Sequence, residues 1–413
     1  MIIYSKDNSL QEKNRPKILH IISGYPWPLH NGNHIRRYHI LRSLSNCGNL
    51  DLLAITRPSA KIPDEISSLC HRVIAFPMNA PKRRTSDKID LYLILKVLRE
   101  LSGWPLDDQR PGIKTFPPEV LEILKVNYDI VWIDRLSTSL ILGYEGQNAV
   151  LDFDDIEHLK IKRELMVTEK SLLRKFRLLI YMRAWSIAEM AALKKFGHVI
   201  VCHEKDREYL AESNVVVIPN GIEVPENTSF TPGVPGRMIY VGTMSYPPND
   251  DAVRYFIKDI LPRIKLNCPE AHLVVVGANP SKQLKDLADG KLVQVLGKID
   301  NVAPYLKKSA LSVVPLRIGG GTRLKILESL AYKTPVVSTT VGAEGLELEH
   351  GNHILIADEP EAFADFCISL LKNKIQCIQL AEAGYERVLK QYSSETIETH
   401  IRNFVRSALA QKT

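Results

Sequence analysis

Short apolar runs alternate with amphipathic stretches along almost the whole chain. Such runs, rich in β-branched residues, predict buried strands at 17–22, 51–55, 72–76, 129–133, 149–153, 198–202, 215–218, 238–242, 272–277, 292–296, 311–315, 335–339 and 353–357. Continuous apolar strands that alternate with helices are typical of parallel sheets covered on both faces. Because these strands are too many for one twisted sheet, the pattern predicts an α/β protein with two doubly wound domains.

A stretch rich in proline and glycine interrupts this alternation near the middle of the chain. We interpret residues 222–236 as an interdomain linker because they lack any periodicity. The remaining chain divides into a disordered N-terminal extension over 1–16, a first domain over 17–221 and a second over 237–391. A C-terminal helix is expected over 392–413, where it can cross back onto the first domain.

Composition and charge restrict the class of protein. The six cysteines are scattered without a C-x-x-C pair, which argues against a disulfide framework or a zinc ribbon and for a reducing compartment. The first sixteen residues lack the apolar core of a signal peptide, so we expect a cytoplasmic protein. The net charge of +7 suits anionic substrates or an anionic membrane surface and is too diffuse to indicate nucleic acid.

One stretch in the second half of the chain has a composition that favours close contact with a ligand. In "PLRIGGGTRLKILESLAYKTPVVST" (315–339), three glycines lie between a predicted strand and a predicted helix, and a further strand follows. Glycine costs more backbone entropy on folding than any other residue, so three in a row favour a loop whose N–H groups must approach a ligand. A helix N-terminus binds anions, and phosphate is the expected ligand. The alternative is a surface loop followed by a solvated Lys325–Glu328 pair.

Several segments together resemble a known family. They are "SGYPWPLHNGNHIRRYHILRSL", "VCHEKDREYL", "IPNGIE", "YVGTMSYPPNDDAV", "VLGKIDNVAPYL" and the glycine-containing stretch above, in this order along the chain. The chain thereby resembles the retaining glycosyltransferases of family 4. That resemblance implies a GT-B fold, in which two Rossmann-like domains face each other across a cleft.

The resemblance also implies which residues bind the donor, a nucleoside-diphosphate sugar. Glu328 matches the second acidic residue of the family's E-x7-E motif and would bind the donor's ribose, whereas the first acidic position is Gly320 here. The loop after the "YVG" strand lacks the family's Arg/Lys pair, so Arg323 and Lys325 are the expected phosphate ligands and count as catalytic. The remaining donor-binding candidates are Gly242, Gly297, Lys298, Ile299, Gly319, Gly320, Gly321 and Thr322, of which Thr322 is expected to cap the helix.

The first domain would then bind the acceptor, a glycan or a lipid-linked molecule. Asp154 and Asp155 in "DFDDIEHL" take the place of a family histidine that faces the donor sugar, and they are further catalytic candidates. Gly32, Asn33 and Arg36 are expected to line the acceptor side. The "DFD" carboxylates could alternatively bind Mn²⁺, but the resemblance implies catalysis without metal or cofactor.

Two basic amphipathic stretches, 92–106 and 169–195, suggest a membrane partner. Cations such as Arg174 and Arg177 alternate there with large apolar residues, a pattern that suits the inner face of an anionic membrane. Buried core helices with solvated cations are the alternative.

The expected function is sugar transfer in cell-surface or exopolysaccharide synthesis. A nucleotide-sugar 2-epimerase-like isomerase and a non-catalytic nucleotide-sugar-binding protein remain alternatives.

Overall fold

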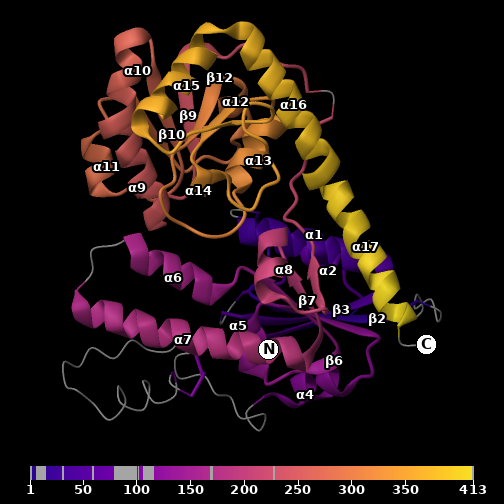
Figure 1. Cartoon of the computed structure of the whole chain (residues 1–413). Helices are drawn as coiled ribbons and strands as arrows, with labels where there is room; N and C mark the ends of the chain where they lie inside the picture. Colours follow the sequence, from indigo (N-terminus) through magenta and orange to yellow (C-terminus); the bar gives the residue numbers. More distant parts are fainter. Residues whose placement is uncertain are drawn as a thin grey trace. The chain divides into compact units, whose positions relative to one another are not determined.

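The computed structural model describes residues 2–5, 15–29, 32–57, 60–78, 100, 102–105, 116–167, 171–226 and 228–411. The chain forms two compact units (Figure 1). Unit 1 comprises Met1–Pro219 together with Ile397–Thr413, and unit 2 comprises Asn220–Thr396.

Unit 1 is built on one sheet of predominantly parallel strands. In the described part of the chain its order is β1-β4-β3-β2-β5-β6-β7-β8, and only the pairing of β1 with β4 is antiparallel. The strands are β1 (Ile2–Ser5), β2 (Lys17–Ser23), β3 (Asn49–Thr56), β4 (Arg72–Pro77), β5 (Ile130–Asp134), β6 (Gly146–Asp154), β7 (Phe196–Val201) and β8 (Val215–Val217).

Helices cover both faces of this sheet. They are α1 (Gly32–Cys47), α2 (Asp64–Ser67), α4 (Pro118–Lys125), α5 (Leu136–Leu142), α6 (Glu157–Val167), α7 (Leu172–Lys195), α8 (Glu204–Leu210) and α17 (Ser394–Ala410). Successive residues of β2 point to opposite faces, so Ile18 and Leu19 belong to different hydrophobic clusters. No helix among the described residues is long and apolar enough to cross a membrane.

Unit 2 contains a second, entirely parallel sheet with the order β11-β10-β9-β12-β13-β14. Its strands are β9 (Val234–Val241), β10 (His272–Val276), β11 (Val293–Gly297), β12 (Ser309–Val314), β13 (Val336–Ser338) and β14 (Leu355–Ile356). Its helices are α9 (Pro247–Tyr255), the π-helix η3 (Phe256–Ile260), α10 (Leu261–Asn267), α11 (Lys282–Asp286), α12 (Ala303–Lys307), α13 (Leu324–Ala331), α14 (Thr340–Ala343), α15 (Pro360–Lys372) and α16 (Lys374–Tyr392).

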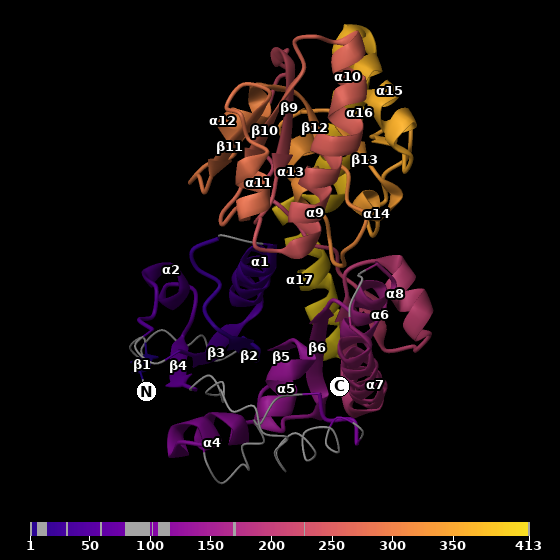
Figure 2. The same ribbon diagram turned by 90° about the vertical axis from the view of Figure 1, so that its left-hand side faces the viewer.

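The strand order of unit 2 locates a ligand-binding edge. The chain passes from β9 to β10 and β11 on one side and then returns to β12 on the other, so the order reverses between β9 and β12 (Figure 2). In open α/β sheets, ligands bind beyond the carboxyl ends of the strands at such a switch point. In unit 2 that edge lies beyond Val241 and Val314, next to the glycine-containing loop.

The prediction of two doubly wound domains is confirmed, and every predicted strand overlaps an observed one. Three predicted boundaries differ from the structure. Residues 2–5 of the expected disordered extension form β1, which adds to the edge of the sheet through β4. Residues 222–236 belong to unit 2, where Ile222 is buried and pairs with Ser393, and β9 already begins at Val234.

The boundary at the C-terminus lies at Ile397 rather than at residue 392. Helix α17 packs in unit 1 through Ile397, Ile401 and Val405, which lie four residues apart on one helical face. Phe404 on the same helix contacts the indole of Trp132 edge-on, with the ring centres 5.8 Å apart. The stretch 92–106 lies largely outside the described residues.

Candidate functional site

The three glycines follow β12 at the switch point of unit 2. Gly319 has a φ of +134° and Gly321 a φ of +78°, a region of backbone conformation that side chains other than glycine rarely adopt. Arg323 fixes the shape of this loop: its guanidinium donates to the carbonyl oxygens of Gly320 and Val341, and its side chain is buried. These donors of Arg323 are directed at the backbone, and its expected role as a phosphate ligand stays a prediction.

Helix α13 begins immediately after the loop, with Arg323 at the N-cap position. Thr322 does not cap the helix, contrary to expectation; its hydroxyl oxygen accepts a hydrogen bond of 2.8 Å from Nδ2 of Asn220 instead. No acidic residue occupies the first turn of α13, so its N-terminal dipole is not neutralised from within the helix. Anions are therefore favoured at this end of α13.

Lys325 on α13 reaches the end of the neighbouring strand β9. Its Nζ lies 2.8 Å from the hydroxyl oxygen of Tyr240 and 2.7 Å from Oδ1 of Asn249. Burial, reinforced by the positive charge of Arg323, lowers the pKa of Lys325 to about 7. A Cβ at Gly242 would lie 2.9 Å from this Nζ and 2.8 Å from Nδ2 of Asn249, so only glycine leaves room for the lysine there.

Glu328 lies one turn further along α13 and is half-buried. Burial raises its pKa to about 7, although the charge of Lys325 acts in the opposite direction. In the part of the chain that the structure describes, no ion pair joins Lys325 to Glu328; the amine bonds to Tyr240 and Asn249 instead. The alternative interpretation of the two residues as a solvated salt bridge is therefore wrong.

Gly297, Lys298 and Ile299 lie at the carboxyl end of β11, on the same edge of the sheet. The carbonyl oxygen of Gly297 accepts a hydrogen bond of 2.9 Å from the N–H of Gly277, which fixes the loops after β10 and β11 together. Lys298 is exposed, whereas Ile299 packs against the small cluster beside β9 and β10. These residues are two strands away from β9, so they lie at the same edge of the sheet but at a distance from Lys325.

In unit 1, the guanidinium of Arg36 donates its hydrogen bonds to other groups of the protein. Its guanidinium forms two hydrogen bonds, of 2.8 and 3.0 Å, to the buried carboxylate of Asp152 and a third, of 3.1 Å, to the carbonyl oxygen of Ile218. Both charged side chains are almost fully buried. The expectation that Arg36 lines the acceptor side is not supported, because its donors are used inside unit 1.

Asp154 lies at the end of β6 with a strained backbone. Its φ is +60°, and that of Arg135, at the end of the adjacent strand β5, is +66°. The two side chains form an ion pair of 2.8 Å. Burial alone would raise the pKa of Asp154, but the guanidinium groups of Arg135 and Arg36 outweigh it and lower the pKa. Backbone strain of this kind accumulates at functional sites.

Asp155 differs from Asp154 because, within the described residues, it forms no ion pair, although the charges of Lys160 and Arg135 act on its pKa. Burial and the negative charge of Asp154 raise the pKa of Asp155 to about 6. The two adjacent carboxyls therefore differ in proton affinity at neutral pH. Sequence reasoning missed Arg135, whose positive φ no local pattern indicates.

The switch point of unit 1, between β2 and β5, is occupied by another residue that sequence reasoning missed. Arg37 pairs with Asp134 at 2.5 Å and donates a hydrogen bond of 2.7 Å to the carbonyl oxygen of Ser23. Burial raises the pKa of Asp134 to about 6, although Arg37 acts in the opposite direction. Gly32 and Asn33 form the first residues of α1, the helix that carries Arg37.

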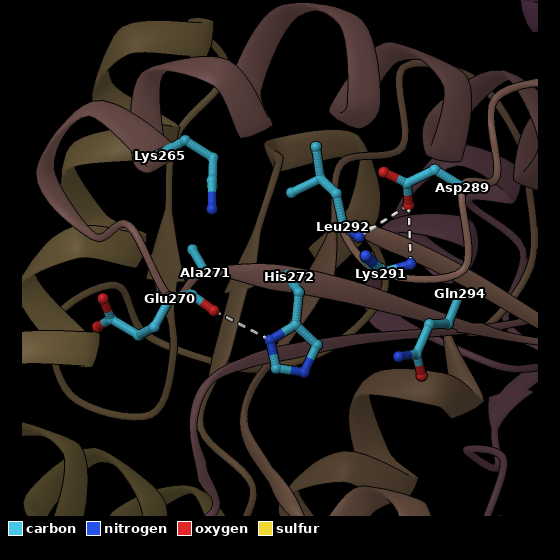
Figure 3. Close-up of a pocket in the computed structure, with 8 residues that line it drawn as sticks. All are labelled: Lys265, Glu270, Ala271, His272, Asp289, Lys291, Leu292 and Gln294. Atoms are coloured by element: carbon cyan, nitrogen blue, oxygen red, sulfur yellow. Dashed lines mark hydrogen bonds between the residues drawn. The ribbon is translucent and has the colours of Figure 1, made fainter.

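A pocket of ≈420 Å³ lies at the other end of the unit 2 sheet. Residues at the amino ends of β10 and β11 line it, among them His272 and Gln294, and Lys265 and Asp289 lie on opposite sides of His272 (Figure 3). It is separated from the glycine loop by the length of the strands. Within the described residues, no group of three or more His, Cys, Asp or Glu side chains is arranged to hold a metal ion.

Comparison with known proteins agrees with this fold. Residues 235–373 match the family model described as "Glycosyl transferases group 1". Among solved structures, the fold is similar to that of sucrose-phosphate synthase from Thermosynechococcus elongatus, with a TM-score of 0.67, 17% identity and coverage of 96% of this chain and 100% of the other. Anabaena HepE in complex with UDP and glucose superposes with a TM-score of 0.60 and 13% identity over 95% of this chain and 100% of the other. These likenesses show the GT-B fold.

Sequence relatives cover a smaller part of the chain. A phosphatidyl-myo-inositol mannosyltransferase of Mycobacterium leprae is 26% identical over 201 residues, which are 46% of this chain and 52% of the relative. An uncharacterized 44.6 kDa protein in the cps region of Klebsiella pneumoniae is 23% identical over 173 residues, or 40% of this chain and 45% of the relative. The chain thus spans about half the length of the curated relatives it matches.

We predict that Arg36 contributes to stability and not to ligand binding. Arg36→Ala leaves the charge of Asp152 buried without a partner, so the free energy of unfolding in urea should fall by about 3–5 kcal/mol. Arg174→Ala removes an exposed arginine and should change it by less than about 0.5 kcal/mol. Equal unfolding free energies for wild type and Arg36→Ala would contradict the assignment.

Proposed function

We propose that this chain, whose residues 235–373 match the glycosyl transferases group 1 family, transfers a sugar, with retention of configuration, from a nucleoside-diphosphate sugar to a glycan or lipid-linked acceptor. One observation carries the proposal: the glycine loop, the amine of Lys325 and the carboxyl of Glu328 all lie at the switch-point edge of one parallel sheet. This combination suits a ligand that carries a diphosphate next to a ribose.

In the proposed reaction, the bond between the anomeric carbon and the diphosphate oxygen breaks while the acceptor oxygen bonds to that carbon. The acceptor proton passes to the leaving diphosphate on the same face of the sugar, so no protein nucleophile is needed. Negative charge grows on the diphosphate through an oxocarbenium-like state. The amides around Gly319–Gly321 and the N–H groups of Lys325 would stabilise that charge.

The acceptor would bind to unit 1 near Asp154 and Asp155. Of the two, Asp155 is the better hydrogen-bond partner for an acceptor hydroxyl, because Arg135 already occupies Asp154. The relatives support a surface-polymer or lipid acceptor: one lies in a cps region, and the other is named for phosphatidyl-myo-inositol. We infer a role in cell-surface or exopolysaccharide synthesis.

Gly320 favours a second candidate function, that of a non-catalytic nucleotide-sugar-binding protein. An acidic residue at this position would bind the transferred sugar, and glycine has no side chain to do so. The test is the release of nucleoside diphosphate. A transferase releases it only when an acceptor is added, an isomerase needs no acceptor, and a binding protein releases none.

We predict different kinetic effects for Glu328 and Lys325. Glu328→Ala removes the hydrogen bonding between a carboxylate and the ribose, worth about 1.5–3 kcal/mol in total, so donor affinity should fall roughly ten- to a hundredfold. Lys325→Ala should lower turnover more than donor affinity, because the leaving phosphate gains charge in the transition state. Glu361→Ala on α15 removes an exposed carboxylate of the same unit and serves as the control. Wild-type donor affinity in Glu328→Ala would refute the assignment.

We predict that turnover survives chelation. The carboxylates of Asp152 and Asp154, the alternative metal ligands, are already paired with Arg36 and Arg135 at 2.8 Å, and a metal ion would have to displace both cations. The rate of sugar transfer in the presence of EDTA should therefore equal the rate without EDTA. Activity that is lost in EDTA and restored by Mn²⁺ or Mg²⁺ would show that these carboxylates form a metal site.

We propose further that helix α7 binds anionic membranes. Its N-terminal half exposes Leu172, Leu173, Phe176 and Leu179 by 86, 73, 60 and 48%. Arg174, Arg177 and Arg183 are exposed on the same half, and no acidic residue lies between 172 and 188. Apolar side chains that insert between lipids, flanked by cations that attract acidic headgroups, are typical of helices that lie in a membrane interface.

Binding to vesicles tests this surface. The wild-type protein should co-sediment with vesicles of phosphatidylglycerol and phosphatidylcholine, less so at high salt, and weakly with phosphatidylcholine alone. Leu173→Asp should weaken co-sedimentation, whereas Leu266→Asp, at a leucine of unit 2 that is 84% exposed, should not. Sedimentation that is independent of acidic lipid and unchanged in Leu173→Asp would rule out α7 as the contact.

A further inference from the structure

The amine of Lys325 is held by two neutral side chains. It lies 2.8 Å from the hydroxyl oxygen of Tyr240, 2.7 Å from Oδ1 of Asn249 and 4.3 Å from the centre of the Tyr240 ring. The Tyr240 hydroxyl donates in turn to Oδ1 of Asn249 at 2.8 Å, which closes a triangle of hydrogen bonds. Nδ2 of Asn249 donates to the carbonyl oxygen of Thr243 and fixes this triangle to the loop after β9.

The carboxylates near this amine are either paired elsewhere or one turn away. On α9, Asp250 pairs with Arg254 and Asp251 with Arg317, at 2.8 and 2.6 Å. The charged neighbours of Lys325 are Arg323, at the N-cap of α13, and Glu328 on the same helix, and among the described residues no ion pair joins Glu328 to the amine. A protonated amine has three N–H donors, and the triangle uses two. One N–H is therefore left for a ligand beside Gly242.

We propose that Tyr240 and Asn249 are positioning residues that hold Lys325 for the leaving diphosphate, and that Lys325 gains its proton when the diphosphate binds. This inference rests on the proposed function. The loop after β9 has no cation of its own, so α13 supplies one across the sheet. Neutral partners can position the amine without a fixed counter-charge that would compete with the phosphate.

The sign of the pH dependence follows from the surroundings of the amine. Burial holds the pKa of Lys325 at about 7 in the free protein, and an adjacent diphosphate must raise it. Below pH 7 the free amine is already charged, and binding takes up no proton there. Above pH 7 the amine must be protonated when the diphosphate binds. The affinity for the diphosphate therefore falls by up to about tenfold per pH unit, until the pH reaches the pKa of Lys325 in the complex.

The test is calorimetry of UDP, GDP and ADP binding at pH 8.5 in two buffers with different ionisation enthalpies. At this pH Glu328 is already ionised, since its pKa is raised only to about 7, and the diphosphate, with a second pKa near 6, is fully charged. Wild type should therefore take up close to one proton on binding, and Lys325→Met should take up none.

Two variants separate positioning from folding. Asn249→Asp places a carboxylate next to the amine of Lys325, so that the amine is already protonated before the diphosphate binds. The variant should therefore show neither proton uptake on binding nor a pH-dependent diphosphate affinity above pH 7. Tyr240→Phe removes one acceptor and should weaken diphosphate binding at pH 8.5 roughly three- to tenfold while the uptake remains. Gln294→Glu makes the same change of charge at the other end of the sheet and should behave as wild type.

The outcomes distinguish this inference from the proposed function. Diphosphate binding without proton uptake at pH 8.5, or an uptake in Asn249→Asp equal to that of wild type, overturns the role of the triangle and leaves the donor site intact. If none of the three diphosphates binds, the proposed function fails and this inference fails with it.

Discussion

The proposed donor site of unit 2 depends on a steric constraint at residue 242. The ends of β9 and β12 are adjacent, and the amine of Lys325 fills the space that a side chain at Gly242 would occupy. Because glycine stands there, a helix that follows β12 can deliver a cation to the end of β9. The glycine loop adds peptide dipoles at the same edge, and Arg323 holds that loop by its carbonyl oxygens.

The strands β4-β3-β2-β5-β6-β7 of unit 1 follow the same order as the six strands of unit 2, but charged side chains are paired differently in the two units. In unit 1, the arginines at the carboxyl ends of the strands are paired with aspartates: Arg36 with Asp152, Arg37 with Asp134, and Arg135 with Asp154. In unit 2, Lys325 bonds to neutral groups. A site that neutralises itself is suited to neutral hydroxyl groups, and an amine without a fixed counter-ion is suited to a diphosphate. This contrast agrees with the proposed assignment of acceptor and donor to the two units.

Much of the fold could be predicted from the sequence, because buried parallel strands are continuous apolar runs and their alternation with helices fixes the topology. The glycine loop and the proximity of Lys325 to the switch point followed from that topology. Side-chain partners could not be predicted: nothing local indicates that Arg323 turns toward Val341, that Thr322 bonds to Asn220, or that Arg36 reaches Asp152, 116 positions away. Such contacts are set by the packing of distant elements.

Hydrogen–deuterium exchange with UDP, GDP or ADP tests most directly whether the diphosphate binds at the switch point of unit 2. The account predicts that ligand slows exchange in peptides over 317–329 and 241–246, which hold the glycine loop and the end of β9, because bound phosphate oxygens accept hydrogen bonds from those amides. Exchange should be unchanged around His272 and Asp289, at the other end of the strands. Protection confined to that opposite pocket, with none in 317–329, would contradict the account.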